Sequence, residues 1–204
     1  MPSLAITGII GSGKSTALNL LTTTLASKNL ESINFSADKE NRRLLDEDLE
    51  VREQIRYELG KDCYSSVGVA DRARIFNIIT TDLLAKKKLE DILHPRLEKL
   101  WKPLANEFRK EKTSFFIAEI PLLYEKRLES FFDKTLLVGC SDRIRRARLE
   151  QQRSMASSDA SRWTNLQHSQ ESKIPKADYL LWNDGSEQNL ILQIRHFVAT
   201  LSLT

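Results

Sequence analysis

The sequence predicts an α/β fold in which a parallel β-sheet carries helices on both of its faces. Buried parallel strands are short, nearly continuous apolar runs, and such runs alternate here with longer stretches of helical periodicity. A glycine-rich turn joins the first run to a helix, which supplies the crossover that two parallel strands require. The five expected strands are residues 4–7, 32–35, 115–118, 135–140 and 179–182.

The turn that follows the first strand fills every fixed position of the pattern G-x-x-x-x-G-K-S, the P-loop, at residues 8–15. Its glycines allow the backbone to curl around an anion, towards which the positive end of the helix dipole points. An ordinary glycine–serine turn is the alternative, but both the strand before it and the helix after it favour a P-loop. The residues expected to hold the phosphates of a nucleotide are Gly11, Ser12, Gly13, Lys14, Ser15 and Thr16.

Within this loop two side chains have distinct expected roles. Lys14 is placed to reach the β and γ phosphates. The Ser15 hydroxyl is placed to ligate Mg²⁺.

Residues 39–112 show helical periodicity and no convincing strand, which predicts a helical insertion too long to be a simple connection. The first periodic stretch ends at Gly60, a good C-terminal stop. Asp71 is placed to cap a second helix that extends to Leu83. Pro95 is expected to break this pattern or to begin another helix.

Two more helices are expected after the fourth strand. Residues 141–153 predict a capped, arginine-rich helix, and residues 186–201 predict an amphipathic closing helix after an Asn-Asp-Gly turn. Phosphoryl transfer spreads negative charge over the γ oxygens, and arginines stabilise it. We expect at least one arginine of residues 141–153 to do so, although a solvated charged face explains any single one equally well.

Acidic residues follow two of the predicted strands, at the edge where open α/β sheets bind ligands. Asp38 is a candidate to meet an acceptor hydroxyl near the γ-phosphate; the alternative, which does not exclude the first, is an N-cap of the helix beginning at Lys39. Glu119 follows four apolar residues and is a candidate to hold Mg²⁺ directly or through water, or else a surface residue at a strand end.

Other polar groups give weaker signals. Asn183 lies on the loop after the last strand, where it is placed to contact a base, but spacing alone favours a turn. The three histidines show no metal-ligand spacing, and we assign no catalytic histidine.

Composition limits the classes of function. The net charge of +3, from 31 basic and 28 acidic residues spread along 204, does not favour a nucleic-acid partner. Cys63 and Cys140 lack the spacing of a zinc site or a disulfide framework. With no basic region followed by a long apolar segment, we expect a cytoplasmic protein that does not bind membranes.

Several motifs, in this order and at similar spacing, resemble the dephospho-CoA kinase family over nearly the whole chain. They are residues 7–16, Asp38, Gly68-Val69-Ala70-Asp71-Arg72, Leu93-His94-Pro95, Ile120-Pro121-Leu122-Leu123-Tyr124-Glu125, Gln167, and Ala177-Asp178 with Asn183. A P-loop alone fits many families, whereas the His-Pro pair, the Pro-Leu-Leu-x-Glu run and the Ala-Asp ending are more specific.

The resemblance implies a P-loop kinase that transfers the γ-phosphate of ATP, with Mg²⁺, to the 3′-hydroxyl of the dephospho-CoA ribose, the last step of coenzyme A synthesis. It implies a nucleotide-binding core at about 1–38, 113–140 and 174–204, a helical substrate region at about 39–112 and a lid at about 141–173. By the same resemblance, Asp38 would be the acid that accepts or orients the proton of the 3′-hydroxyl, and Arg72, His94 and Pro95 would bind the acceptor. Asn183 would lie at the adenine of ATP. Arg148 and Arg153 would be catalytic arginines of the lid.

Some positions depart from the family's usual pattern. Ser36 stands where an acid is common, which removes one possible ligand of Mg²⁺ or water, so metal binding is expected to depend more on Ser15 and Glu119. Ile9 replaces a glycine of the P-loop, and Glu119 stands where Asp is common. Two rival functions are a P-loop kinase for another small acceptor, such as a nucleoside monophosphate or shikimate, and a nucleotide-dependent switch. The family landmarks argue against the first, and the lack of an Asn-Lys-x-Asp motif and of a second acid after Glu119 argues against the second.

The oligomeric state stays open between a monomer and a weak homo-oligomer.

Overall fold

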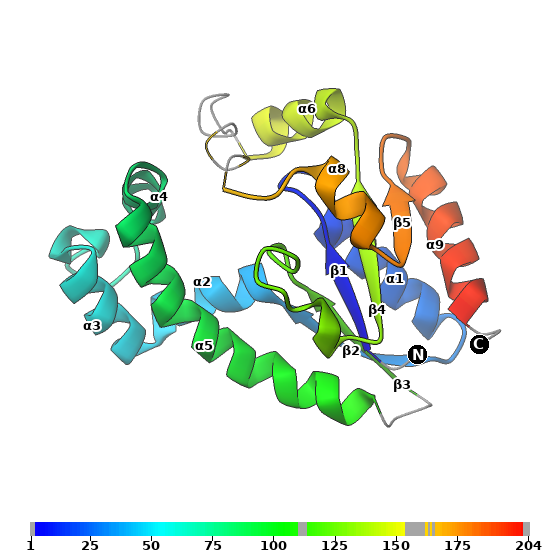
Figure 1. Ribbon diagram of the computed structural model, residues 1–204, viewed down its shortest axis with the longest axis horizontal. Coiled ribbons are helices and arrows are strands. Elements are labelled where there is room, and N and C mark those ends of the chain that lie inside the picture. Colours follow the sequence, from blue (N-terminus) through cyan, green and yellow to red (C-terminus); the bar gives the residue numbers. More distant parts are fainter. Residues whose placement is uncertain (1–2, 110–113, 154–161, 163, 165, 202–204) are drawn as a thin grey trace. The chain divides into compact units, whose positions relative to one another are not determined.

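The computed structural model describes residues 3–109, 114–153, 162, 164 and 166–201. The chain divides into two compact units, Met1–Ser36 with Pro103–Thr204, and Ala37–Lys102. Within the described residues of the first unit, five parallel strands form one sheet in the order β2-β3-β1-β4-β5 (Figure 1). The strands are β1 Ser3–Thr7, β2 Glu31–Ser36, β3 Ser114–Glu119, β4 Lys134–Gly139 and β5 Tyr179–Trp182.

All five predicted strands and their parallel arrangement are confirmed, with ends that shift by about one residue. The three central strands are almost wholly buried, which explains their continuous apolar sequences, while the edge strands β2 and β5 are partly exposed. Because the strands are parallel, their carboxyl ends meet at one edge of the sheet. The P-loop and Glu119 lie at that edge.

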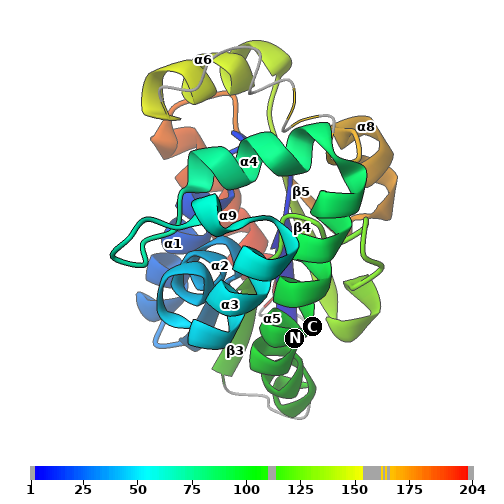
Figure 2. The same ribbon diagram turned by 90° about the vertical axis from the view of Figure 1, so that its left-hand side faces the viewer.

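Helices cover both faces of the sheet, as predicted. On one face α1, Lys14–Ala26, and α9, Glu187–Leu201, lie beside each other (Figures 1 and 2). The core on this face consists mostly of leucine, isoleucine and valine side chains. On the other face, the ring of Phe116 packs against Phe108 at the end of α5 and against Phe132, at centroid distances of 6.1 and 6.4 Å.

The predicted helices after the fourth strand are also present. Helix α6 is Asp142–Arg153 and begins where the Ser141 hydroxyl accepts a hydrogen bond from the Ile144 N–H at 3.4 Å. Helix α9 begins after Ser186, whose hydroxyl accepts from the Asn189 N–H at 3.3 Å. Among the described residues of this unit, the shorter elements are α8 Gln170–Lys173 and the 3₁₀ turns η2 Glu129–Phe131 and η3 Ile174–Lys176.

The unit Ala37–Lys102 is helical, as expected for an insertion. It contains α2 Ala37–Glu47, α3 Leu49–Glu58, η1 Lys61–Cys63 and α4 Arg72–Thr81. It also contains the first part of α5, Leu83–Phe108, as far as Lys102, and the rest of that helix belongs to the other unit. Asp71 caps α4 as predicted, because its carboxylate accepts from the Arg74 N–H at 2.9 Å.

Three predicted boundaries in this unit are wrong. The periodicity before Gly60 belongs to two helices, since Asp48 ends one and caps the next through the Val51 N–H at 3.0 Å. Leu83 begins α5 instead of ending α4, and its side chain is exposed. Helix α5 also continues through Pro95. Proline has no N–H to donate to the carbonyl of Asp91, four residues earlier. Pro95 and Asp91 are both exposed, so this lost hydrogen bond lies on the solvent side of the helix.

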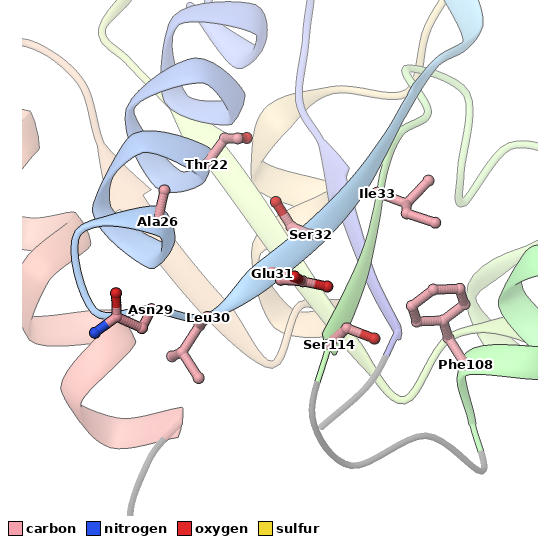
Figure 3. Close-up of a pocket in the computed structure, with 9 residues that line it drawn as sticks. All are labelled: Thr22, Ala26, Asn29, Leu30, Glu31, Ser32, Ile33, Phe108 and Ser114. Carbon is pink, nitrogen blue, oxygen red and sulfur yellow. The ribbon is translucent and has the colours of Figure 1, made fainter.

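A pocket of about 570 Å³ lies at the edge of the sheet where β2 and β3 begin (Figure 3). Its lining residues are Thr22, Ala26, Asn29, Leu30, Glu31, Ser32, Ile33, Phe108 and Ser114. Ligands of open α/β sheets bind beyond the carboxyl ends of the strands, and this pocket lies at the opposite ends. It is therefore not part of the candidate site.

Cys63 and Cys140 are buried free thiols, and burial raises the pKa of each thiol above its usual value. In the part of the chain that is described, no helix combines the length and the apolar composition needed to cross a bilayer.

Asp178, from the Ala-Asp motif, lies at the start of β5, far along the strands from the P-loop edge. Its carboxylate accepts from the backbone N–H and the hydroxyl of Thr135, each at 2.9 Å, and from Lys134 Nζ at 3.1 Å. Burial raises the pKa of Asp178, but these hydrogen bonds outweigh burial and hold the pKa below its ordinary value. The motif therefore joins β4 to β5 and has a structural role.

We expect Asp178→Asn to lower the melting temperature at pH 7, and the difference from wild type to shrink in acid. A carboxylate with a depressed pKa in the folded state stabilises the fold above its unfolded pKa of about 3.9, and this contribution is lost as the pH falls through the folded pKa. Thermal melts of both proteins at pH 7, 5 and 3 measure the effect. A difference that stays constant down to pH 3 would contradict it.

Candidate active site

The P-loop connects β1 to α1 and adopts backbone angles that favour glycine. Gly11 and Gly13 have φ values of 81° and 91°, and a Cβ atom on Gly13 would lie 2.3 Å from Asn183 Nδ2. Within the described residues no side chain caps the N-terminus of α1, in contrast to α3 and α4. This end of the dipole is therefore directed at the loop, which suits an anion.

Two side chains inside the loop fit the same interpretation. The hydroxyl oxygen of Ser12 is buried and has no hydrogen-bond partner among the described residues, as in a loop whose polar groups are completed by a ligand. The Lys14 side chain is 7% exposed, and its Nζ donates to the Ile9 carbonyl at 3.2 Å. The cation is therefore held across the loop, next to the backbone that would surround the phosphates.

Three oxygen-bearing side chains converge beside the loop. Glu119, at the end of β3, is 1% exposed, and its Oε1 accepts from the Ser15 hydroxyl at 2.9 Å. Its Oε2 accepts from the Ser36 hydroxyl at 3.1 Å. Among the described residues no group of three or more His, Cys, Asp or Glu side chains forms a metal cluster. One carboxylate with two hydroxyls is instead the hard-oxygen donor set that suits Mg²⁺ shared with nucleotide phosphates.

Arg148 and Asn183 hold the P-loop from outside. The Asn183 Nδ2 donates to the Ser12 carbonyl at 2.8 Å, and Arg148 Nη1 donates to the same oxygen at 3.3 Å. Arg148 Nη2 also donates to the Asn183 carbonyl at 2.8 Å. Asn183 is therefore more than the turn residue that spacing favours, because its buried side chain contacts the loop directly.

The other arginines of α6 differ in their surroundings. Arg145 is buried, with Nη1 donating to the Thr164 hydroxyl at 2.7 Å and Nη2 paired with Asp142 at 3.0 Å. Arg143 and Arg146 are exposed. Arg153 is the last residue of α6, and its side chain lies outside the described part of the chain.

The predicted acceptor-side residues all belong to the unit Ala37–Lys102. Asp38 is exposed and lies in the first turn of α2, not at its N-cap, because the helix begins at Ala37. Arg72 begins α4 and forms an ion pair with Asp46. His94 and Pro95 lie within α5, the first partly buried and the second exposed.

The fold and this site define a class of protein, the P-loop kinases. Shikimate kinase from Acinetobacter baumannii in complex with shikimate has the same fold, with a TM-score of 0.56, 15% identity, and coverage of 100% of this chain and 96% of that one. Dephospho-CoA kinase from Campylobacter jejuni is more similar, with a TM-score of 0.65, 25% identity, and coverage of 98% and 96%.

Sequence comparison identifies the family. The dephospho-CoA kinase family model matches residues 3–189. The dephospho-CoA kinase of Rickettsia bellii (strain RML369-C) is 33% identical over 204 residues, which cover 98% of each chain. The chain belongs to the dephospho-CoA kinase family, and it is accordingly a transferase that uses ATP.

Proposed function

We propose that this chain phosphorylates the 3′-hydroxyl of the dephospho-CoA ribose with the γ-phosphate of ATP, and that Mg²⁺ takes part. The observation that carries the proposal is the convergence of the Ser15 and Ser36 hydroxyls on the buried Glu119 carboxylate beside the P-loop. A P-loop with an acid at the end of a neighbouring strand is the arrangement that nucleotide-dependent phosphoryl transfer requires. The choice of dephospho-CoA as the acceptor rests on membership of the family.

On the nucleotide side, we propose a role for each P-loop residue. The backbone of Gly11, Ser12 and Gly13 holds the phosphates, Lys14 neutralises the transferred group, and the first turn of α1 with Ser15 and Thr16 completes the site. Ser15 and Glu119 would hold Mg²⁺, whose charge offsets that of the phosphates when it is bound. Asn183 would lie by the adenine, and Arg148 and Arg153 would contact the transferred phosphate.

On the acceptor side, we propose that Asp38 accepts or orients the proton of the 3′-hydroxyl and that Arg72, His94 and Pro95 bind the rest of dephospho-CoA. A loose phosphoryl transition state asks little of a base, so positioning and charge neutralisation supply most of the acceleration. We propose that residues of about 39–112 bind the acceptor and that residues of about 141–173 act as a lid.

We further propose that the protein works in the cytoplasm on small molecules and binds neither nucleic acid nor membranes. Its small net charge of +3 supports this, because polyanion-binding proteins concentrate positive charge.

An acceptor panel tests the proposal. The protein is incubated with ATP·Mg²⁺ and either dephospho-CoA, shikimate or a nucleoside monophosphate, and products are detected by mass. We expect CoA and ADP in equal amounts from dephospho-CoA, and turnover of the other acceptors near background. Loss of ATP without any phosphorylated acceptor would favour a nucleotide-dependent switch.

We expect Glu119→Gln to raise the Mg²⁺ concentration needed for half-maximal activity by about tenfold, because an amide is a weaker ligand for a hard cation. The size and most of the contacts of the side chain are kept. The measurement is initial rate against Mg²⁺ at saturating ATP and dephospho-CoA. Glu150→Gln, at an exposed position on α6, is the control, and an unchanged Mg²⁺ dependence in Glu119→Gln would remove Glu119 from the metal site.

A further inference from the structure

A glutamine outside the nucleotide site contacts the backbone of the P-loop. The Oε1 atom of Gln167 accepts a hydrogen bond from the Ile10 N–H at 2.9 Å. The next turn of the loop is closed by the bond from the Ser12 N–H to the Ile9 carbonyl at 3.2 Å. One backbone donor of the loop is thus bound by a side chain more than 150 positions away in the sequence, instead of being left for a phosphate.

The segment that carries Gln167 is itself fixed by a buried ion pair. Lys173, at the end of α8, is 0% exposed, and its Nζ lies 2.8 Å from Glu125 Oε1. The same carboxylate oxygen accepts from the backbone N–H of His168, the residue after Gln167, at 2.7 Å. Two charges in such surroundings hold their partners firmly, because a broken pair would leave an uncompensated charge in the interior.

The contacts close into a ring around the base of the P-loop. Lys173 Nζ donates to the Pro121 carbonyl at 3.2 Å, and so does the hydroxyl of Thr7, the residue before the loop, also at 3.2 Å. The contacts therefore lead from Thr7, at the end of β1, through Pro121 to Lys173 on α8. They continue through Glu125 to the segment of Gln167, which returns to the loop at Ile10.

We propose that Gln167 is a positioning residue for nucleotide binding, which sets the curvature of the P-loop through Ile10, and that the Glu125–Lys173 pair fixes Gln167 in place. The proposal rests on the proposed function, since it concerns the same phosphate site. Gln167 acts on the backbone of the loop, through the hydrogen bond that its Oε1 accepts from the Ile10 N–H. Its effect comes from holding the loop backbone in the conformation that receives the anion, a form of preorganisation.

The test compares two glutamines that make the same kind of bond. Gln167→Met keeps the length of the side chain but removes the acceptor for Ile10. Gln170→Met is the matched control, because Gln170 Oε1 accepts from the backbone N–H of Cys140, outside the P-loop, also at 2.9 Å. The measurements are the KM for ATP, the KM for dephospho-CoA, the Kd for ADP by calorimetry, and the melting temperature.

We expect Gln167→Met to raise the KM for ATP and the Kd for ADP by about tenfold, with the KM for dephospho-CoA unchanged. Gln170→Met should change both nucleotide constants by less than about twofold, even where it lowers the melting temperature as much. Equal losses of nucleotide affinity in the two variants would overturn the proposal, and so would an unchanged ADP affinity in Gln167→Met. If wild type binds ADP but makes no CoA, the proposed function fails while this inference still stands or falls by the ADP measurement.

A second pair of variants tests the support of Gln167. Lys173→Met alone leaves the charge of Glu125 buried and uncompensated, which destabilises the fold, so the informative protein is the double variant Glu125→Met/Lys173→Met, in which apolar side chains of similar size replace the pair and leave no acceptor for the His168 N–H. We expect this variant to fold and to show the same selective rise in the Kd for ADP. A folded double variant with wild-type ADP affinity would overturn the role assigned to the pair.

Discussion

Lys14→Ala is expected to lower kcat/KM for ATP by about a thousandfold, the largest loss that any single substitution in this chain should cause. Lys14 is buried and its amine lies 3.2 Å from the Ile9 carbonyl, so the cation is already fixed across the loop before a nucleotide arrives. A cation that needs no reorganisation stabilises the charge that develops on the transferred phosphoryl group more strongly than a mobile one. The measurement is the steady-state formation of CoA over a range of ATP concentrations.

Two controls separate this effect from loss of the fold. Lys28→Ala removes an exposed lysine just after α1 and should leave activity within about twofold of wild type. The melting temperature of Lys14→Ala shows whether the loop still forms. A folded Lys14→Ala enzyme that retains more than a tenth of wild-type kcat/KM would contradict the phosphate-binding role of the loop.

The sequence predicts the sheet and the P-loop well because both depend on local pattern. The central strands read as apolar runs since they are buried on both faces, and the fixed positions of residues 8–15 encode the loop without reference to distant parts of the chain. Glu119 becomes a candidate by the same reasoning, because the acid ends such a run. Its burial and its contact with Ser15 agree with the interpretation as part of the site, although its role with metal stays a prediction.

The parts that sequence reasoning misses depend on contacts between distant segments. Ser36 is read only as a position that lacks an acid, yet its hydroxyl donates to Glu119. Spacing alone favours a turn at Asn183 and the family resemblance places it at the adenine, but neither indicates that its amide donates to the Ser12 carbonyl. No periodicity encodes either contact. At Pro95 the sequence carries a local signal that the structure does not follow. Proline favours a helix break, but Pro95 and Asp91 lie on the exposed side of α5, and the helix continues.

Asp38→Asn is expected to lower kcat by about a hundredfold while the KM values for ATP and dephospho-CoA stay within about twofold. The amide keeps the size of the side chain in the first turn of α2, where the residue is exposed, so the fold of the helix should survive. It cannot accept a proton from the hydroxyl, and it orients that hydroxyl less strongly than a charged oxygen does. Since these interactions matter chiefly as the phosphoryl group transfers, the loss should appear in kcat.

The matched control is Glu47→Gln, which neutralises an exposed acid in the last turn of the same helix and should leave kcat unchanged. Single-turnover measurements with excess enzyme show whether the chemical step itself is slower, because they exclude product release. If the single-turnover rate of Asp38→Asn equals that of wild type, Asp38 does not act on the acceptor hydroxyl, and another group must orient it. If both KM values rise instead while kcat holds, Asp38 contributes to uniform substrate binding and not to the transition state.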